Sequence, residues 1–388
     1  MASSGDRSDG SDTESKRQMA HNKTTTIIDN IVVRKRLQNK AYKQQSIGHS
    51  RKEVLISPEE TTLGKPEMHE NNITGISKNC SPIIKYIFVK TTKTAGSAVT
   101  TLFFRYAVTH NLIAVANLET HELHVSDGKV NASRYSCAKH FPGYDVIANH
   151  ISWYDYKALN SEIPNAKFIT VLRSPYTQYE SAFYYYKIHL NLKLERFNNP
   201  FKEFLDQGYH KTNNSRMRHQ KRNGQLVRLG YPRLGDHNNQ TKIELKISEL
   251  DKELDLVMLT EYLDESCVLL KKMMCWETDD VIFGTCYRLP RPRIPITSKM
   301  ENIIAEWNAG DLKLYQHFNK TLWTKIENYD GDFEGDLQQL RERKNELSSL
   351  CVDKVSELGC EAINRCYAAW KTILSKRQEE RFCGTSTH

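Results

Sequence analysis

The feature that most constrains the fold of this 388-residue chain is a series of short apolar runs that alternate with helical patterns. Six of the seven residues at 83–89 (Ile-Ile-Lys-Tyr-Ile-Phe-Val) are apolar or aromatic, which predicts a buried strand. An apolar-periodic run that ends at His110 predicts a helix after it. The repeated order of strand and helix predicts an α/β fold with a central parallel sheet covered on both faces. The further expected strands are 112–116, 145–150, 167–172 and 255–260, and the further expected helices are 153–160, 175–188 and 261–275.

The rest of the chain divides by composition. The start is rich in Ser, Lys, Gln and Asn and has little to bury, which predicts disorder. Within the folded domain we expect a polar loop at 118–143 and an irregular insertion at 205–240, whereas patterns at 303–318 and 336–347 predict helices. The expected divisions are a disordered segment at 1–55, a polar lead-in at 56–82, a folded domain at 83–330 and a mostly helical tail at 331–388.

Composition excludes several classes of protein. The net charge of +8 is too mild for a histone-like tail, so no nucleic-acid partner is expected, but it suits a groove that receives anions. Nine Cys in a chain of this length do not make a disulfide-dense miniprotein, although those at 351, 360, 366 and 383 could cross-link the C-terminal tail. The chain shows neither a run of about 18 apolar residues nor a secretory signal, so no membrane span is expected in this sequence.

The turn after the first strand carries a candidate anion site. It contains Lys93, Thr94, Ala95, Gly96 and Ser97, and the amides and dipole of the following helix favour an anion there. Lys93 adds a positive charge, and Thr94 and Ser97 add hydroxyl donors. The Lys precedes the only Gly, which is not the Walker A spacing, so an ATPase or GTPase is only weakly indicated. The structural alternative is a helix capped by Ser97 with a solvent-facing Lys.

A second candidate anion site follows the strand at 167–172. Arg173 precedes Ser174, a plausible N-cap, and Pro175, which suits the first position of a helix. Ser181 lies about two turns further on, so an Arg fork and a hydroxyl could grip a phosphate monoester. A capped helix with a surface Arg is the alternative. Two such sites at the carboxyl ends of parallel strands, where ligands bind in open sheets, are less readily explained by chance.

His150 ends the strand at 145–150 and should open on the same edge of the sheet. A lone His at a strand end is more often structural than catalytic. Beside two phosphate sites, however, it could take a proton from a hydroxyl, because its pKa lies near neutrality. No metal site is expected, because the His and Glu residues at 121, 122, 124 and 140 lack zinc-type spacing, and the first three are expected in a loop.

Several motifs follow one another from residue 83 to 351, roughly two thirds of the chain. They are 88–97 (FVKTTKTAGS), 149–150 (NH), 168–175 (FITVLRSP) with 180–183 (ESAF), 256–266, 269–276, 307–308 and 314–319. With them the chain resembles the Golgi carbohydrate sulfotransferases that use 3′-phosphoadenylyl sulfate, and among these the galactose 3-O-sulfotransferase family, which includes the galactosylceramide sulfotransferases. The heparan uronyl 2-O-sulfotransferases resemble the core more distantly.

The resemblance implies a P-loop-like sulfotransferase fold and a role for each candidate residue. The loop at 93–97 matches the one that holds the 5′-phosphosulfate, and Arg173 and Ser181 match the pair that binds the 3′-phosphate. His150 matches the general base of the related 2-O enzymes and would take the proton of the acceptor hydroxyl as it attacks sulfur. Lys93 would stabilise the charge on the departing phosphate oxygen, and no metal is needed.

The function implied by the resemblance is sulfuryl transfer to the 3-hydroxyl of a β-galactose on a glycolipid or glycan. The implied setting is the Golgi lumen, in a type II membrane protein, although the family's N-terminal apolar anchor is missing here. Either this sequence starts downstream of its anchor or is spliced around it, or the protein departs from its family. The alternatives are a uronyl 2-O-sulfotransferase, suited to basic segments at 211–233 and 288–293, a P-loop kinase, and a noncatalytic nucleotide-binding relative.

Some details leave the branch and the acceptor open. Thr92 and Ala95 replace the commoner His and Gly of vertebrate relatives, which puts the branch but not catalysis in doubt. The aromatic run at 184–186 could stack on a sugar or pack in a core. Seven N-x-[ST] triplets give partial support for a secretory-pathway glycoprotein, at Asn22, Asn72, Asn79, Asn131, Asn213, Asn239 and Asn319.

Overall fold

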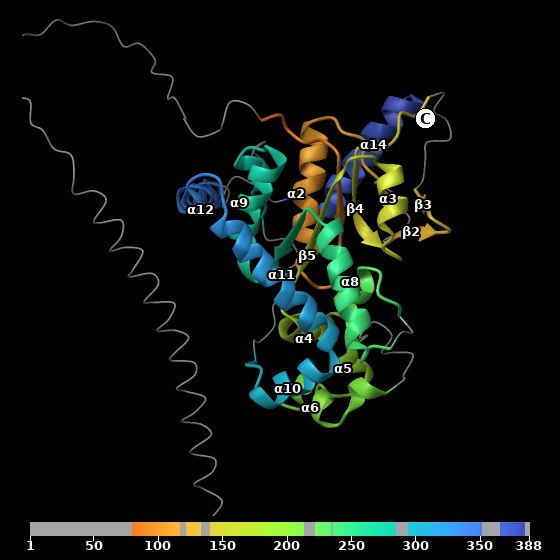
Figure 1. Ribbon diagram of the computed structural model, residues 1–388, viewed down its shortest axis with the longest axis vertical. Coiled ribbons are helices and arrows are strands. Elements are labelled where there is room, and N and C mark those ends of the chain that lie inside the picture. The colour runs from red at the N-terminus through yellow and green to blue at the C-terminus, as the bar shows by residue number, and fades with distance from the viewer. Residues whose placement is uncertain are drawn as a thin grey trace, which may run out of the picture. The chain divides into compact units, whose positions relative to one another are not determined.

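A computed structural model gives the fold of most of the chain (Figure 1). It describes residues 80–116, 122–132, 140–212, 222–233, 236–284, 294–350 and 365–384. The expectations for the disordered start, for most of the lead-in, for the basic segment at 288–293 and for four of the N-x-[ST] triplets lie outside the described residues. No helix in these ranges is long and apolar enough to cross a membrane.

The fold is organised around a six-stranded sheet with the order β3-β2-β4-β1-β5-β6. Its strands are β1 (Tyr86–Val89), β2 (Glu122–Ser126), β3 (Lys129–Asn131), β4 (Val146–Ile151), β5 (Lys167–Leu172) and β6 (Leu256–Leu259). All neighbours are parallel except β2 and β3, which form an antiparallel edge. Every residue of β1 and β6 is buried, as expected for strands that are covered on both faces. The predicted α/β fold with a mainly parallel sheet is therefore confirmed.

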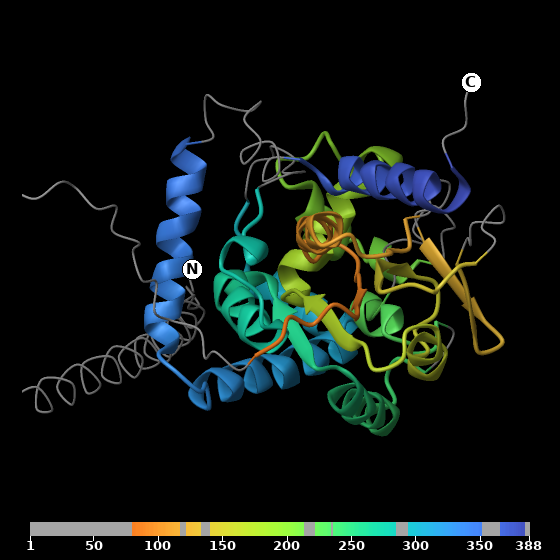
Figure 2. The same cartoon turned by 90° about the horizontal axis from the view of Figure 1, so that it is seen from above.

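Helices cover both faces of this sheet. They include α2 (Gly96–Thr109), α3 (Tyr156–Glu162), α8 (Gln240–Glu253), η3 (Thr260–Tyr262), α9 (Leu263–Met274), η4 (Asp279–Val281), α11 (Ala309–Glu327), α12 (Phe333–Leu350) and α14 (Tyr367–Cys383). Right-handed crossovers place α2 on the face opposite to α3 and α8. Figure 2 shows α2 and α14 on one side of the strands and α3, α8 and α11 on the other. In the described part of the C-terminal region, α12 and α14 contribute buried residues to the same core as the sheet.

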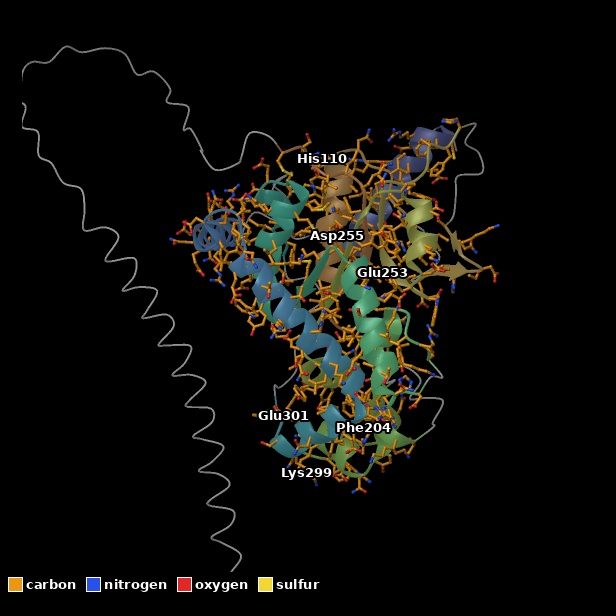
Figure 3. The ribbon with its side chains drawn as sticks, viewed as in Figure 1. His110, Phe204, Glu253, Asp255, Lys299 and Glu301 are labelled. Atoms are coloured by element: carbon orange, nitrogen blue, oxygen red, sulfur yellow. A yellow bond between two sulfur atoms is a disulfide. The ribbon has the colours of Figure 1, made fainter. Side chains whose placement is uncertain are left out.

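A second, smaller core lies among helices that follow β5 and precede α11. These are α4 (Pro175–Tyr185), α5 (Ile188–Asn191), α6 (Pro200–Asp206), η1 (Tyr209–Lys211) and α10 (Ser298–Trp307), whereas α7 (Gly224–Arg228) packs in the main core through Leu226. Phe183 and Phe204 are fully buried at its centre. An ion pair of 3.0 Å between Lys299 and Asp206 joins α10 to α6. Figure 3 shows Phe204 and Lys299 in this helical layer, apart from Asp255 beside the sheet.

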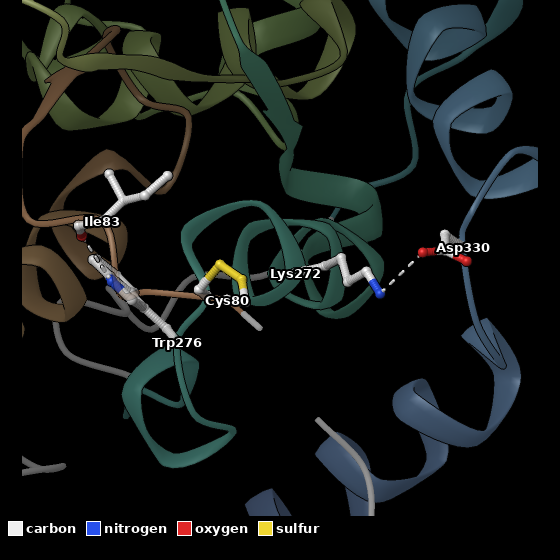
Figure 4. Close-up of a disulfide and its surroundings, with 6 residues drawn as sticks. Cys80, Ile83, Lys272, Trp276 and Asp330 are labelled. Carbon is white, nitrogen blue, oxygen red and sulfur yellow. Dashed lines mark hydrogen bonds and ion pairs between the residues drawn. A yellow bond between two sulfur atoms is a disulfide. The ribbon is translucent and has the colours of Figure 1, made fainter. Parts of the chain in front are cut away.

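A disulfide fastens the start of the described chain to the end of α9. Cys80 is bonded to Cys275, and the two cysteines are 195 residues apart in sequence. Next to them the indole of Trp276 donates a hydrogen bond of 3.0 Å to the carbonyl of Ile83 (Figure 4). Trp276 also stacks on Tyr106 of α2, with ring centroids 3.7 Å apart. These contacts hold the segment that leads into β1 against α2 and α9.

The expected polar loop at 118–143 is wrong, because this segment contains β2 and β3. Glu122 and His124, which were expected in a loop, lie in β2. The hairpin turns at Asp127 and Gly128, which both adopt left-handed backbone angles (φ 51° and 67°). An Asp-Gly pair is a strong hairpin signal. The segment is polar in composition because only alternate residues of β2 are buried.

The expected strand at 112–116 is reduced to a single bridge between Ala114 and Val146. Both backbone groups of Ala114 bind the side chain of Gln378 in α14. The amide of Ala114 donates to Oε1 at 2.6 Å, and Nε2 donates to the carbonyl of Ala114 at 3.0 Å. A glutamine side chain thereby takes the place of a neighbouring strand and satisfies the backbone polar groups.

Several expected helices have different limits. The helix expected at 153–160 begins at Tyr156, because Asp155 caps it by accepting a hydrogen bond from the amide of Ala158. The helix expected at 175–188 is interrupted, because Lys187 adopts a left-handed conformation with φ 55°. In addition, the expected irregular insertion at 205–240 contains η1 and α7, and the helix expected at 303–318 is divided between α10 and α11.

Candidate functional site

The three predicted parts of the site lie side by side at one edge of the sheet. β1 is the parallel neighbour of both β4 and β5, so the carboxyl ends of these strands share that edge. The loop at 90–95 is hydrogen-bonded to both neighbours. His150 Nδ1 lies 2.8 Å from the carbonyl of Lys90, and Arg173 Nη1 donates to the carbonyl of Lys93 at 3.4 Å. The structure therefore brings the candidate base and the two candidate anion sites together.

The loop at 90–95 has a conformation that surrounding side chains hold in place. Lys93 and Ala95 adopt left-handed backbone angles with φ 62° and 61°, which costs roughly 1–2 kcal/mol each for residues other than Gly. Gln178 Nε2 donates to the carbonyl of Thr92 at 2.9 Å, and the Thr260 hydroxyl donates to the carbonyl of Thr94 at 2.9 Å. The loop is thus braced from α4 and from the end of β6.

The helix that follows the loop begins without a side-chain cap. Ala95 is the N-cap residue of α2, and Ser97 is the second residue inside the helix. The structural alternative of a Ser97-capped helix is therefore wrong. The N-cap residue makes no side-chain hydrogen bond to the first-turn amides, and Ala95, Gly96 and Ser97 line that turn.

Lys93 lies on the open side of the loop. Its side chain is half-buried, and its ammonium nitrogen is 3.5 Å from the ring centroid of Tyr185 in α4. Tyr185 is 51% exposed, so this ring is not part of the core, whereas Tyr184 packs at the edge of the second core. A cation–π contact of this kind attracts the ammonium group to the face of the ring.

The hydrogen bond of His150 sets the tautomer of its ring. Because a backbone carbonyl can only accept, the nitrogen that faces Lys90 carries the proton, and the acceptor of the neutral ring is Nε2. In the sheet His150 is paired with Glu122 of β2, which forms an ion pair with Arg228 of α7. This arrangement can present a basic nitrogen to a substrate hydroxyl.

Arg173 is held at the start of α4 by several contacts. Its Nε donates to the Thr177 hydroxyl at 2.9 Å. Ser181 lies one turn beyond Thr177 on the same face of α4 and is half-buried. Pro175 occupies the first turn as expected, but Ser174 makes no side-chain cap, and its amide instead donates to Glu261 at 3.0 Å. A phosphate at this place would therefore bind chiefly to the guanidinium and the hydroxyls.

Two residues that the sequence did not single out position Arg173. The Gln225 side chain accepts a hydrogen bond from the Arg173 amide at 2.9 Å and donates to its carbonyl at 2.8 Å. Gln225 lies in the first turn of α7, where the buried carboxylate of Asp311 accepts from the amides of Gln225 and Leu226. Burial raises the pKa of Asp311 to about 7. This chain of contacts connects α11, through α7, to the end of β5.

Sequence reasoning found the residues that face the site and missed those that brace it. Gln178, Gln225 and Asp311 are buried polar residues, and all three lie outside every motif. Thr260 and Glu261 lie within the motif at 256–266, which was the one available signal for them. Part of the basic segment expected at 211–233 and all of that at 288–293 lie outside the described residues.

The chain is similar in sequence to known proteins. Residues 45–366 match the family model of galactose-3-O-sulfotransferases. Galactosylceramide sulfotransferase from Mus musculus is 29% identical over 296 residues, which cover 74% of this chain and 69% of the relative. Galactose-3-O-sulfotransferase 2 from Sus scrofa is 30% identical, with 70% and 69% covered, and human galactosylceramide sulfotransferase is 31% identical, with 72% and 66% covered. The chain therefore belongs to the galactose-3-O-sulfotransferase family.

Proposed function

We propose that the protein transfers a sulfuryl group from 3′-phosphoadenylyl sulfate to the 3-hydroxyl of a β-galactose residue on a glycolipid or glycan. The observation that carries this proposal is the pair of hydrogen bonds made by the loop at 90–95. One goes to His150 and the other to Arg173, so a base and an arginine lie on either side of one anion-binding loop. Such an arrangement fits a nucleotide with anionic groups at both its 5′ and 3′ positions, held beside an acceptor hydroxyl.

The donor site is assigned to residues of the loop and of α4. Residues 93–97 would hold the 5′-phosphosulfate, because the uncapped start of α2 and the Lys93 ammonium both favour negative charge. Arg173 would bind the 3′-phosphate with Ser181, since Thr177 already directs the guanidinium along α4. When bound, 3′-phosphoadenylyl sulfate supplies an activated sulfuryl group on a phosphate leaving group.

The chain supplies a base and a positive charge to the reaction. The neutral ring of His150 directs its Nδ1 proton at the Lys90 carbonyl. Its Nε2 accepts the proton of the galactose hydroxyl as the hydroxyl oxygen attacks sulfur. Lys93 places its ammonium group where negative charge grows on the departing phosphate oxygen. The bracing of the loop by Gln178 and Thr260 keeps this charge in place without rearrangement during the reaction.

The acceptor is assigned from the exposed aromatic surface beside Lys93. The ring of Tyr185 is half exposed and adjoins the loop, and an aromatic face of this kind can pack on the apolar face of a sugar ring. The names of the relatives supply the identity of the sugar as galactose. We further propose a lumenal location in the Golgi, because disulfides involve Cys80, Cys275, Cys366 and Cys383 and such bonds persist in oxidising compartments.

The proposed reaction is tested by sulfate transfer to matched acceptors. The protein is incubated with radiolabelled 3′-phosphoadenylyl sulfate and with galactosylceramide, a β-lactoside, the 3-O-methyl derivative of that lactoside, or desulfated heparan. Label should enter the first two and not the 3-O-methyl derivative, whose reactive oxygen is blocked. Transfer to heparan and to no galactoside would select a uronyl sulfotransferase, and no transfer to any galactoside would refute the proposal.

Single substitutions test the assigned roles. His150→Ala should lower turnover by about 10²- to 10⁴-fold, while affinity for 3′-phosphoadenosine 5′-phosphate stays close to that of the wild type. Arg173→Ala should instead weaken that affinity. His124→Ala is a matched control, because His124 is an exposed residue of β2, and both quantities should remain unchanged. Normal turnover by the His150 variant would remove the assignment of the base.

A further inference from the structure

Glu122 lies level with the candidate base on the neighbouring strand. β2 is the parallel neighbour of β4, and its first residues are in register with the last residues of that strand, Glu122 with His150 and Leu123 with Ile151. Residues in register on parallel strands are about 5 Å apart and point to the same face of the sheet. The amide of Ser152 donates to the carbonyl of Leu123 at 2.9 Å, which keeps this register beyond the end of β4. A carboxyl side chain is therefore held next to His150 at the carboxyl edge of the sheet.

Arg228, the last residue of α7, orients the carboxylate of Glu122. The two side chains form an ion pair, and Arg228 Nη1 also donates to the carbonyl of Ile151 at 3.5 Å. The side chains of Glu122 and Arg228 are 31% and 24% exposed, so the pair is accessible to a ligand. Among the described residues, Arg228 is the one hydrogen-bond donor to this carboxylate, which has about four acceptor sites. The carboxylate can therefore accept further hydrogen bonds from a ligand.

The groups at this edge follow the order of the strands. Arg173 comes directly after β5, the loop at 90–95 after β1, His150 lies near the end of β4, and Glu122 lies in β2. The proposed donor groups therefore lie on one side of His150, and Glu122 lies on the other. A carboxylate repels phosphate and sulfate groups but accepts hydrogen bonds from hydroxyls. Glu122 therefore suits the acceptor sugar and not the nucleotide.

Helix α7 connects the two sides of the site. Gln225, in its first turn, makes two hydrogen bonds with the backbone of Arg173, and Arg228 at its end pairs with Glu122. Gln225 and Arg228 are three positions apart, which places them on the same face of the helix. The buried carboxylate of Asp311 accepts from the amide of Gln225 at 3.1 Å and fixes the start of α7. One short, braced helix therefore sets the position of Glu122 relative to Arg173.

We infer that Glu122, oriented by Arg228, binds a hydroxyl of the acceptor galactose next to the one that reacts. The inference rests on the proposed function, and it names a residue that selects the acceptor. The 2- and 4-hydroxyls of galactose flank its 3-hydroxyl, so a 3-hydroxyl at His150 brings one of them toward a carboxylate on the adjacent strand. The negative charge of Glu122 also disfavours an anionic sugar such as a uronate. Arg228 is a positioning residue, because it acts through Glu122.

The inference is tested by combining Glu122→Gln with acceptors that lack single hydroxyls. The acceptors are the better of the two galactosides in the transfer assay and its derivatives with a 2-deoxy or a 4-deoxy galactose. With the parent acceptor, Glu122→Gln should lower kcat/KM by about tenfold, because a hydrogen bond to a charged group is weakened. With the deoxy acceptor that lacks the bound hydroxyl, the same substitution should change kcat/KM by less than about twofold, since the two changes remove one interaction.

Two controls separate acceptor binding from support of the fold. Affinity for 3′-phosphoadenosine 5′-phosphate, measured by calorimetry, should be unchanged in Glu122→Gln, because Glu122 lies on the acceptor side. Glu249→Gln is a matched variant that should change neither quantity, since Glu249 also pairs with a basic side chain, Lys246, on the surface of α8. Arg228→Lys keeps the charge but loses the fork of the guanidinium, so it should lower kcat/KM less, with the same dependence on the acceptor.

The outcomes separate the inference from the proposed function. If the wild type transfers sulfate to the parent galactoside and Glu122→Gln lowers kcat/KM equally with all three acceptors, or leaves it unchanged, the inference is overturned and the proposed function stands. If the wild type transfers sulfate to no galactoside, both are overturned. If thermal melting shows that Glu122→Gln is poorly folded, the same comparison of acceptors with Arg228→Lys decides the inference.

Discussion

Gln225 offers a direct test of how the fold positions Arg173. Its side chain is fully buried, and its amide makes two hydrogen bonds with the backbone of Arg173, at 2.9 Å and 2.8 Å. Gln225→Leu keeps most of the side-chain volume and removes both hydrogen-bonding groups. We expect this substitution to displace Arg173 and to weaken binding of the 3′-phosphate.

The size of the effect follows from the two bonds. A buried donor or acceptor left without a partner costs about 1–3 kcal/mol. The Arg173 backbone is only partly buried, so the lower part of that range applies to each group, and the free energy of unfolding should fall by about 2–4 kcal/mol. A charge-assisted bond to phosphate contributes about 1.5–3 kcal/mol, so a displaced guanidinium should weaken affinity by about tenfold or more.

The assay compares three nucleotides and a matched variant. The nucleotides are 3′-phosphoadenosine 5′-phosphate and the adenosine 3′- and 5′-monophosphates, each titrated by calorimetry. Gln178→Leu is the matched variant, because Gln178 is also a buried glutamine that braces a loop, but it donates to Thr92 in the 5′ site. Gln225→Leu should weaken binding of the two nucleotides that carry a 3′-phosphate. Gln178→Leu should weaken binding of the two that carry a 5′-phosphate.

Two results would contradict this reasoning. If Gln225→Leu weakens binding of all three nucleotides to the same extent, Gln225 supports the fold in general and not the 3′-phosphate site in particular. If the variant loses stability as expected but binds all three nucleotides normally, Arg173 is not the group that binds the 3′-phosphate. Unfolding in urea, measured alongside the titrations, distinguishes these results.

Three further predictions concern stability and the loop. The pKa of Asp311, raised from 3.8 to about 7 by burial, means that the folded chain retains a proton that the unfolded chain releases, so stability should fall as pH rises through this window. This decrease in the free energy of unfolding, on the order of 4 kcal/mol, should be absent in Asp311→Asn. If urea unfolding shows the same dependence of that free energy on pH in both proteins, the prediction is contradicted. Gly96→Ala would place a Cβ 2.7 Å from Cγ of Lys90, so it should disturb the start of α2 and weaken binding of 3′-phosphoadenosine 5′-phosphate by about tenfold in calorimetry, whereas unchanged affinity would show that the start of α2 does not hold the 5′-phosphate. Cys80→Ser opens a loop of 195 residues and should lower the free energy of unfolding by up to about 5 kcal/mol, and a melting curve like that of the wild type would disprove this.

The parts of the site that sequence reasoning identified share a local origin. Lys93, His150 and Arg173 each follow or end an apolar run, and the ends of parallel strands necessarily meet at one edge of a sheet. Some readable signals were overlooked. The Asp127-Gly128 turn marks the β2–β3 hairpin, and the buried residues of α8 recur at helical spacing. Both patterns are local and are present in the sequence.

The mainly parallel α/β sheet and the residues at the carboxyl ends of its strands are predictable from the sequence, because burial periodicity and strand ends are local properties. The contacts that hold this edge of the sheet in place arise only when distant segments of the chain meet. Gln225 reaches Arg173 across 52 residues, and Gln378 reaches Ala114 across 264. The same folding carries Tyr367 to Lys90, from a tail that composition described only as helical. Hydrogen bonds and buried charges depend on which groups meet in space, so no local pattern records them.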